Sequence, residues 1–132
     1  MTNIYKNLLI YMSLIDENLS RIFTIGKVRL FKEYVDLIDI SNLVSRIEKF
    51  GPFVDSFIQD LVDKPTDYSE EIIKRLRTEI DWSISQCTSY LKLLERPKGS
   101  IGDAKALTDP RTLASLLLYK GHLEKLRKRL IF

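Results

Sequence analysis

The sequence is poor in the residues that most catalytic and metal sites require. Its 132 residues include one cysteine and one histidine, Cys87 and His122. A disulfide within the chain needs two cysteines, and a cysteine–histidine zinc site needs several such ligands. Nucleophilic triads need an imidazole to carry the proton, and no carboxylate lies three or four residues from His122 to orient it. The usual nucleophilic and zinc chemistries are therefore not expected.

Carboxylates are the remaining type of metal ligand. Asp16, Glu17, Glu33 and Asp36 could contribute to a carboxylate site, but their spacing selects none, because the Glu-x-x-His pattern of helical carboxylate sites is missing. We therefore expect no metal, no cofactor and no catalytic residue, and we expect that the protein is not an enzyme.

Glycine, proline and long apolar runs are also scarce. Five glycines and four prolines exclude collagen-like and low-complexity chains. No run approaches the roughly 18 apolar residues of a membrane span. The first residues lack the pattern of a signal peptide, since Lys6 interrupts them and Asp16 and Glu17 follow. With one cysteine and no export signal, we expect a cytoplasmic protein.

Apolar residues in the first part of the chain recur at intervals of three and four, the spacing of one helical face. This predicts a helix over 3–23, ended by Gly26, and a second helix over about 27–38. A short hairpin across Gly26 is the alternative, because β-branched and aromatic residues are frequent there. The inward positions of the two helices are Ile4, Leu8, Tyr11, Ile15, Leu19 and Ile22, then Val28, Phe31, Val35 and Ile38.

Two further helices are predicted before residue 65. Asp39 or Ser41 can cap the first of them, and Gly51 can end it. Pro52 suits the first turn of a helix and is unfavourable further inside, so the next helix opens there and stops before Pro65. The inward positions are Leu43, Val44, Ile47 and Phe50, then Phe53, Phe57, Ile58 and Leu61.

The most regular pattern predicts a helix over about 68–95. Asp67 and Glu70 have the spacing of a capping box, and Pro97 closes the helix. Cys87 lies on its apolar face, where a cysteine behaves as a small hydrophobic residue. The inward positions are Ile73, Leu76, Ile80, Ile84, Cys87, Leu91 and Leu94.

A last helix over about 110–130 is predicted after a loop over 98–108. Asp109 can cap it and Pro110 suits its first turn. Gly121 is unfavourable in a helix interior and predicts the close approach of a neighbouring helix. The inward positions are Leu113, Leu116 or Leu117, Lys120, Leu123, Leu126 and Leu130.

These elements predict the fold class. Hydrophobic residues make up 45% of the chain, and a chain of this length buries roughly two thirds of its unfolded surface, enough for one core. No internal repeat or domain linker is evident. We expect an all-α fold over 1–132, a single-domain helical bundle of five to six helices, with two long helices at about 68–95 and 110–130.

Positive charge is concentrated in the second half of the chain. The net charge is −1 over residues 1–66 and +4 over residues 67–132. Such a cluster predicts contact with a nucleic-acid backbone or an acidic protein. The alternative is structural, because cations at a helix C-terminus complement the helix dipole. The predicted contact residues are Lys74, Arg75, Arg77, Lys120, Lys125, Arg127, Lys128 and Arg129.

The segment from Ser69 to Glu95 resembles the helix-turn-helix of winged-helix regulators. The resemblance implies a major-groove helix and a wing that begins near Lys98. The segment departs from that pattern, because the turn lacks a glycine and no second wing strand follows. The unbroken apolar spacing through 77–83 favours one continuous helix. The groove-facing residues implied by the resemblance are Ser83, Ser85, Gln86, Ser89 and Lys92.

Our leading interpretation is a non-enzymatic interaction protein, a small subunit or adaptor that docks on a larger protein or nucleoprotein assembly. Apolar side chains outside the predicted stripes need a cover, either a protein partner or a second copy in a homodimer. The alternative is a nucleic-acid-binding protein that uses the basic last helix. No membrane contact or small-molecule substrate is evident. The uncovered residues are Ile10, Met12, Leu14, Ile131 and Phe132.

Overall fold

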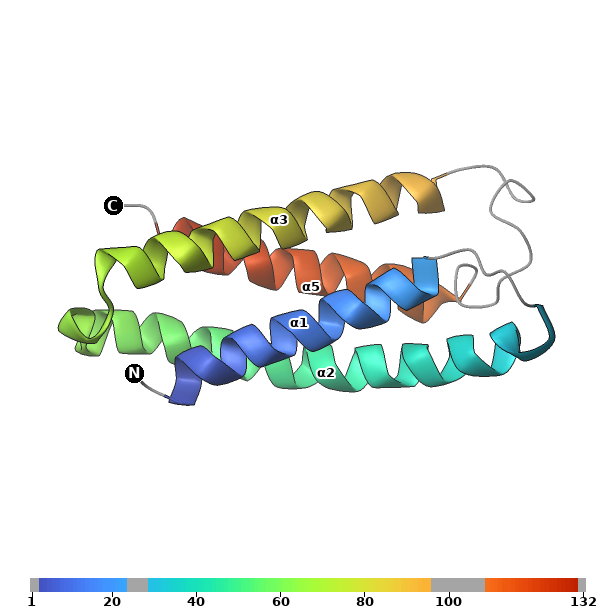
Figure 1. Ribbon diagram of the computed structural model, residues 1–132, viewed down its shortest axis with the longest axis horizontal. Coiled ribbons are helices and arrows are strands. Elements are labelled where there is room, and N and C mark those ends of the chain that lie inside the picture. The colour runs from blue at the N-terminus through green and yellow to red at the C-terminus, as the bar shows by residue number, and fades with distance from the viewer. Residues whose placement is uncertain (1–2, 24–28, 96–108, 131–132) are drawn as a thin grey trace.

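The computed structural model describes residues 3–23, 29–95 and 109–130, and no strand occurs in these ranges. They form four α-helices and one short 3₁₀ helix (Figure 1). The helices are α1 (Asn3–Phe23), α2 (Arg29–Asp63), α3 (Glu70–Leu94) and α5 (Pro110–Lys128), and the 3₁₀ helix is η1 (Pro65–Asp67). The predicted all-α class is confirmed.

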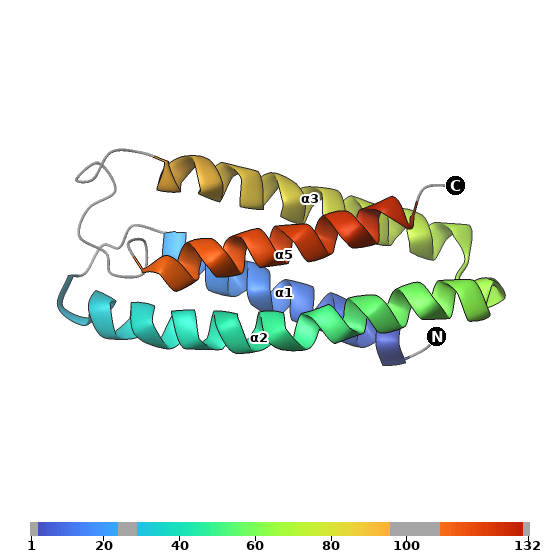
Figure 2. The same cartoon turned by 180° about the vertical axis from the view of Figure 1, so that it is seen from behind.

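The four helices lie along one common axis and alternate in direction (Figures 1 and 2). Helices α1 and α3 run one way, and α2 and α5 run the other. The closest packing joins α1 to α2, α3 to α5, and α2 to α5, whereas α1 and α3 touch over a short stretch. The end of α2, the start of α3 and the end of α5 therefore meet at one end of the bundle, beside η1.

The prediction for α1 is confirmed at both ends, and the hairpin alternative is wrong. The chain is helical up to Phe23 and again from Arg29, so the described residues before and after Gly26 form helices and not strands. Gly26 itself and the inward positions Val28, Phe31 and Val35 lie outside the described side chains. Ile38, predicted inward, is exposed.

The helices predicted over 27–38, 39–51 and 52–64 fall in one helix, α2, so the described residues form four α-helices where five to six were predicted. Gly51 and Pro52 lie inside α2. Proline removes one amide donor and crowds the turn before it. The helix continues because its apolar face continues: Phe50, Val54 and Phe57 are all fully buried. In Figure 2, α2 changes direction gently near its middle, as helices do at an internal proline.

Gly51 is the position where two helices approach closely. A Cβ atom at Gly51 would lie 3.2 Å from the imidazole ring of His122 on α5. At Gly121, where we predicted such an approach, a Cβ atom would meet nothing within 4 Å, so that prediction is wrong. The missing side chain of Gly51 makes room for His122, whose ring also packs edge-on against Phe50.

Helix α3 is continuous, as its apolar spacing predicted. It is capped by Ser69, whose hydroxyl accepts a hydrogen bond from the Ile72 amide at 3.3 Å. The predicted capping box of Asp67 and Glu70 is therefore wrong, because Asp67 belongs to η1. The helix break that a winged-helix geometry requires is absent from α3. Pro97 and residues 98–108, with the wing that was expected to begin near Lys98, lie outside the described residues.

Helix α5 begins as predicted, but it is rotated from the predicted orientation. Asp109 caps it by accepting a hydrogen bond from the Arg111 amide at 2.9 Å, with Pro110 in the first turn. Leu113 and Leu117 point to solvent, and Lys120 is only half-buried. Leu116, one of the two alternatives predicted, is buried, as are the predicted Leu123, Leu126 and Leu130. The buried side chains that were not predicted are Thr112, Ser115 and Tyr119.

The core runs the full length of the bundle. Cys87 is fully buried, as predicted, and burial raises the pKa of its thiol to about 12, so it stays protonated at neutral pH. Met12 was expected outside the apolar stripe of α1 and is buried. Ile10 is exposed, as expected. Aromatic rings fasten the helices to one another, such as Phe23 stacked on Tyr90 with centroids 4.4 Å apart.

Candidate functional site

Half of the predicted basic contact residues are engaged within the bundle. Lys120 pairs with Glu124 at 2.8 Å along α5. Lys125 pairs with Asp55 of α2 at 2.6 Å, and Arg127 pairs with Asp81 of α3 at 2.7 Å. Arg77 donates a hydrogen bond to the Leu130 carbonyl at 3.2 Å. The bonds of Lys125, Arg127 and Arg77 fasten the last part of the chain to α2 and α3, which is a structural use of the cluster.

The other four predicted cations are exposed, and the structure gives them no side-chain hydrogen bond or ion pair within the described ranges. Lys74 and Arg75 lie near the start of α3, and Lys128 and Arg129 lie at the end of α5. Because α3 and α5 are antiparallel, all four gather at the same end of the bundle (Figure 1). Whether these residues contact a partner remains a prediction.

A cavity of about 600 Å³ opens at this end of the bundle. Its floor is aliphatic and comes mainly from the last turns of α2. The rings of Tyr5 and Phe57 hold Tyr68 in place, and its hydroxyl donates a hydrogen bond to Asp60 at 2.6 Å. The cavity is lined by Ile58, Leu61, Val62, Pro65, Tyr68, Glu70, Ile73, Arg77 and Arg129.

The outer face of α5 is apolar as well as its inner face. Leu113, Leu117 and Leu118 are 45%, 52% and 50% exposed. Ala114 and Gly121 complete the same outward stripe and are also exposed. An exposed apolar stripe of this kind commonly marks a contact surface. This stripe, Leu113, Ala114, Leu117, Leu118 and Gly121, is called here the outer face of α5.

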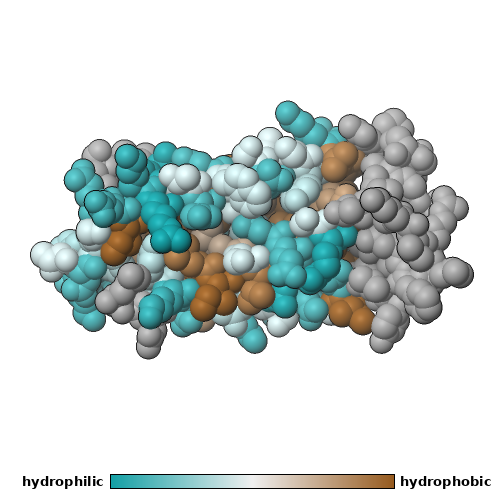
Figure 3. Space-filling model, viewed as in Figure 1, coloured by the Kyte–Doolittle hydropathy of each residue, from teal (hydrophilic) through white to brown (hydrophobic). Residues whose placement is uncertain are grey.

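The opposite side of the molecule differs from the outer face of α5. Figure 3 shows the side formed by α1 and α3, where hydrophilic side chains cover most of the surface and apolar patches are separate from one another. Trp82 on α3 is 54% exposed.

Among the described helices, none is both long enough and apolar enough to cross a membrane.

Asp16 joins three helices inside the bundle. Its two carboxylate oxygens accept hydrogen bonds from Ser83 of α3 and Tyr119 of α5, each at 2.8 Å. Burial raises the pKa of Asp16 to about 6, although the two hydrogen bonds act in the opposite direction. Burial and the carboxylate raise the pKa of Tyr119 well above its ordinary value. Ser83 is therefore committed to Asp16 and does not face a groove.

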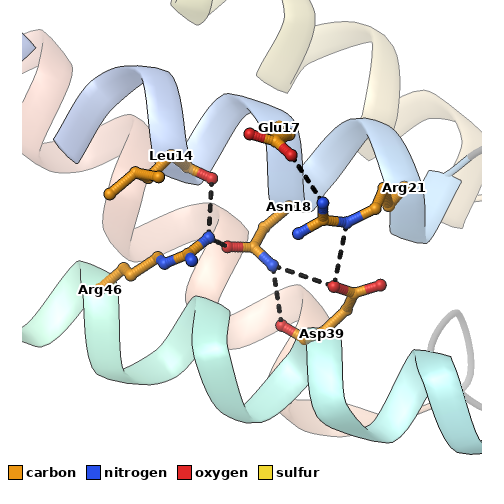
Figure 4. Close-up of polar contacts among 6 residues, drawn as sticks. All are labelled: Leu14, Glu17, Asn18, Arg21, Asp39 and Arg46. Carbon is orange, nitrogen blue, oxygen red and sulfur yellow. Dashed lines mark hydrogen bonds and ion pairs between the residues drawn. The ribbon is translucent and has the colours of Figure 1, made fainter. Parts of the chain in front are cut away.

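A second polar cluster joins α1 to α2 (Figure 4). The Asn18 amide donates to the carbonyl and the carboxylate of Asp39 at 3.4 and 3.2 Å, and its oxygen accepts from Arg46. Arg46 also donates to the Leu14 carbonyl, and Arg21 donates to Asp39, each at 3.2 Å. These bonds fix the register of the two helices and satisfy the buried polar atoms of the cluster except Asp39 Oδ2, which has no hydrogen-bond partner among the described residues.

The polar clusters do not form a metal site. The described residues hold no group of three histidine, cysteine or acidic side chains that could bind a metal ion. His122 is half-buried, and burial lowers its pKa, so its imidazole is neutral at pH 7. Its ring packs on Phe50 and Gly51 rather than on a carboxylate.

Sequence reasoning found part of this arrangement and missed part. It named Arg77 and Arg129, which the fold brings to one cavity. It missed the aliphatic cavity floor because Ile58, Leu61 and Ile73 were assigned to the core. It also missed the exposure of Leu113 and Leu117. The sequence did carry one sign of this exposure, because leucines occupy both faces of the first half of the last helix and only one face can be in the core.

Comparison of the chain with family models, curated proteins and solved structures gives no match.

Proposed function

We propose that the protein is a non-enzymatic helical interaction protein, that it assembles through the outer face of α5, and that a second copy of the chain occupies this face. One observation carries the proposal: three leucines on one stripe of α5 are about half exposed while the opposite stripe is in the core. Water contact with such a stripe is unfavourable, and packing against another helix removes it.

A second copy fits because the stripe is complementary to itself. Asp109, Leu113, Leu117, Gly121 and Lys125 follow one another at intervals of four and form one ridge of the helix. When two such ridges cross antiparallel about a twofold axis at Leu117, residues equally distant from Leu117 meet. Leu117 then faces its own copy, and each Leu113 lies over the open position at Gly121 of the other chain.

Charge supports the same arrangement. The antiparallel register brings the carboxylate of Asp109, which also pairs with Arg111 of its own chain at 2.9 Å, near Lys125 of the other copy at both ends of the ridge. Lys125 is 54% exposed beside its partner Asp55, so it can bridge two carboxylates. A parallel arrangement would place like charges together. The register is therefore set by packing at the centre and by charge at the ends.

The polar clusters support the non-enzymatic part of the proposal. Asp16, Ser83 and Tyr119 are bonded to one another between helices, so they serve packing rather than a substrate. The Cys87 thiol is buried and protonated, which makes it a poor nucleophile.

Sedimentation equilibrium over a concentration series tests the proposal. We expect a reversible dimer, which Leu117→Lys weakens by at least about tenfold because it places two charges at the twofold axis. Gly121→Leu is expected to weaken it too, because it fills the seat of Leu113. Ile10→Lys is the matched control, an equally exposed apolar residue on α1, and should leave the dimer unchanged.

Covalent trapping tests the register. Leu117→Cys should give a disulfide-linked dimer under mild oxidation, because the two sulfur atoms meet on the axis. The unchanged chain is the control, since its one cysteine is buried. A monomer at every concentration, or a dimer that Ile10→Lys disrupts and Leu117→Lys does not, would overturn the proposal.

A further inference from the structure

The cavity at the end of the bundle has the chemistry of a ligand site that is separate from the outer face of α5. We infer that it binds a single-chain amphiphile with one acidic head group, such as a medium-chain carboxylate or alkyl phosphate. Its volume of about 600 Å³ lies within the range of small-molecule pockets.

The floor selects the apolar part of the ligand. Ile58, Leu61 and Val62 come from the last turns of α2, Pro65 begins η1, and Ile73 belongs to the second turn of α3. These side chains are aliphatic, and Val62 is 68% exposed, which is the largest exposure among the described large apolar residues. An alkyl chain placed on this floor removes apolar surface from water on both sides.

The wall opposite solvent is rigid. Tyr68 packs against Phe57 with ring centroids 5.0 Å apart and against Tyr5 at 6.5 Å. Its hydroxyl is committed to Asp60, so Tyr68 contributes the side of a ring and not a free donor. A pocket with a fixed wall needs little ordering when a ligand enters, which favours binding.

Two guanidinium groups select the head group. Arg77 and Arg129 both line the cavity, and Glu70 is the one acidic residue that does so. The Leu130 carbonyl holds one N–H of Arg77, which leaves other donors of that guanidinium for a ligand. Arg129 has no side-chain partner among the described residues. Two arginines match a carboxylate or phosphate, whereas an ammonium head would be repelled.

Calorimetric titration with four probes tests this inference on the full chain. Sodium decanoate below its micelle concentration should bind at one site per chain. Decanol, which has the same tail without charge, should bind at least about tenfold more weakly, because its head cannot pair with the arginines. Acetate, which has the head without the tail, and decyltrimethylammonium should not bind measurably. Decyl phosphate in a parallel titration shows which acidic head the arginines prefer.

Substitutions locate the site. Arg129→Gln should lower decanoate affinity by about fivefold or more, because it removes a charged donor that has no structural partner. Val62→Asp should abolish binding, because it places a carboxylate on the floor, and its exposure makes the change tolerable for folding. Arg75→Gln is the matched control, an exposed arginine of α3 outside the cavity.

A further control separates this inference from the dimer. Leu117→Lys should leave decanoate binding unchanged even where it abolishes self-association, since Leu117 does not line the cavity. Equal affinity for decanoate, decanol and decyltrimethylammonium would overturn the inference, as would the absence of binding. Decanoate binding that survives both Arg129→Gln and Val62→Asp would place the ligand elsewhere and overturn it as well.

Discussion

Asp16 shows how one side chain can serve the bundle and also limit its stability. The carboxylate accepts hydrogen bonds from Ser83 and Tyr119 and so ties α1 to α3 and α5. The same position removes the carboxylate from water, which disfavours its charged form. Desolvation is the larger effect, because the pKa of Asp16 is raised to about 6 from an ordinary value of 3.8.

The raised pKa predicts how stability depends on pH. Between about pH 4 and pH 6 the folded chain holds a proton on Asp16 that the unfolded chain has released. The contribution of Asp16 to folding is therefore complete below about pH 4 and is lost as the pH rises through about 6. A pKa shift of about two units changes the free energy of unfolding by about 3 kcal/mol between these pH values.

Asp16→Asn should remove this dependence. The amide resembles the protonated carboxyl and still accepts a hydrogen bond, so we expect a flat free energy of unfolding between pH 4 and pH 7. We also expect stability at pH 7.5 to increase by about 1–3 kcal/mol. Urea unfolding at a series of pH values measures both. Glu48→Gln, an exposed carboxyl on α2, is the control. An unchanged pH profile in Asp16→Asn would contradict the prediction.

Local pattern predicted some residues of the core and could not predict others. Cys87 was placed inside because it continues an apolar stripe within one helix. Asp16 was considered as a possible metal ligand and not as a residue of the core, because its partners Ser83 and Tyr119 lie 67 and 103 residues away. Hydrogen bonds across such separations depend on how helices pack, which a local pattern does not contain.

At the scale of the element, α2 is where local rules and tertiary structure disagree. Gly51 followed by Pro52 predicts the end of one helix and the start of another, yet the helix continues through both. Pro52 leaves one carbonyl without its helical partner. Burial of the apolar face on both sides of the proline offsets that loss, because an ended helix would expose Phe50 or Val54.

Hydrogen exchange of backbone amides tests the continuity of α2. In one continuous helix the amides of Phe53, Val54 and Asp55 bond to carbonyls in the preceding turn, and they should exchange as slowly as those on either side. In two helices these amides would be first-turn donors without helical partners, and they would exchange rapidly. Amides of the first turn of α3, Glu70 and Glu71, provide the internal reference for unprotected donors.

In helix α5 the spacing of apolar residues correctly predicts a helix, but it does not show which side of the helix faces the core. Leucines occupy both sides of its first half, so no single stripe is distinguished. The structure turns Thr112, Ser115 and Tyr119 inward, because Tyr119 reaches Asp16 and Leu116 fills the core beside it. A polar residue with a satisfied hydroxyl can replace a leucine at a core position, and the pattern of apolar residues gives no sign of it.

At the scale of the molecule, the class of the fold was predictable and the number of helices was not. The spacing of apolar residues at intervals of three and four was enough to identify helices along the chain and the continuity of α3. The end cavity could not be predicted, because it forms only where the end of α2, the start of α3 and the end of α5 meet. Arg77 and Arg129 are 52 positions apart in the sequence and become neighbours through the antiparallel packing of α3 and α5.

The basic cluster gives a prediction about the whole molecule, because the fold divides it into two sets. Lys120, Lys125 and Arg127 are in ion pairs within the bundle, and Arg77 is hydrogen-bonded to the Leu130 carbonyl. The other four are exposed and have no such bond within the described residues: Lys74, Arg75, Lys128 and Arg129.

If the protein binds duplex DNA, we expect the second set to make the phosphate contacts, because its four cations have no ion pair or side-chain hydrogen bond within the described bundle. Each neutralised phosphate contributes about −0.9 to the slope of log K against log salt, so four contacts limit the slope to about −3.6. Fluorescence anisotropy with a labelled duplex at several salt concentrations measures this slope.

Replacing Lys128 and Arg129 with glutamine should reduce the slope by about two units. Replacing Lys125 and Arg127 should leave the slope unchanged and lower the free energy of unfolding, because Asp55 and Asp81 lose their partners. A slope near −7 would mean that all eight predicted cations reach phosphates, and that the internal ion pairs give way on binding.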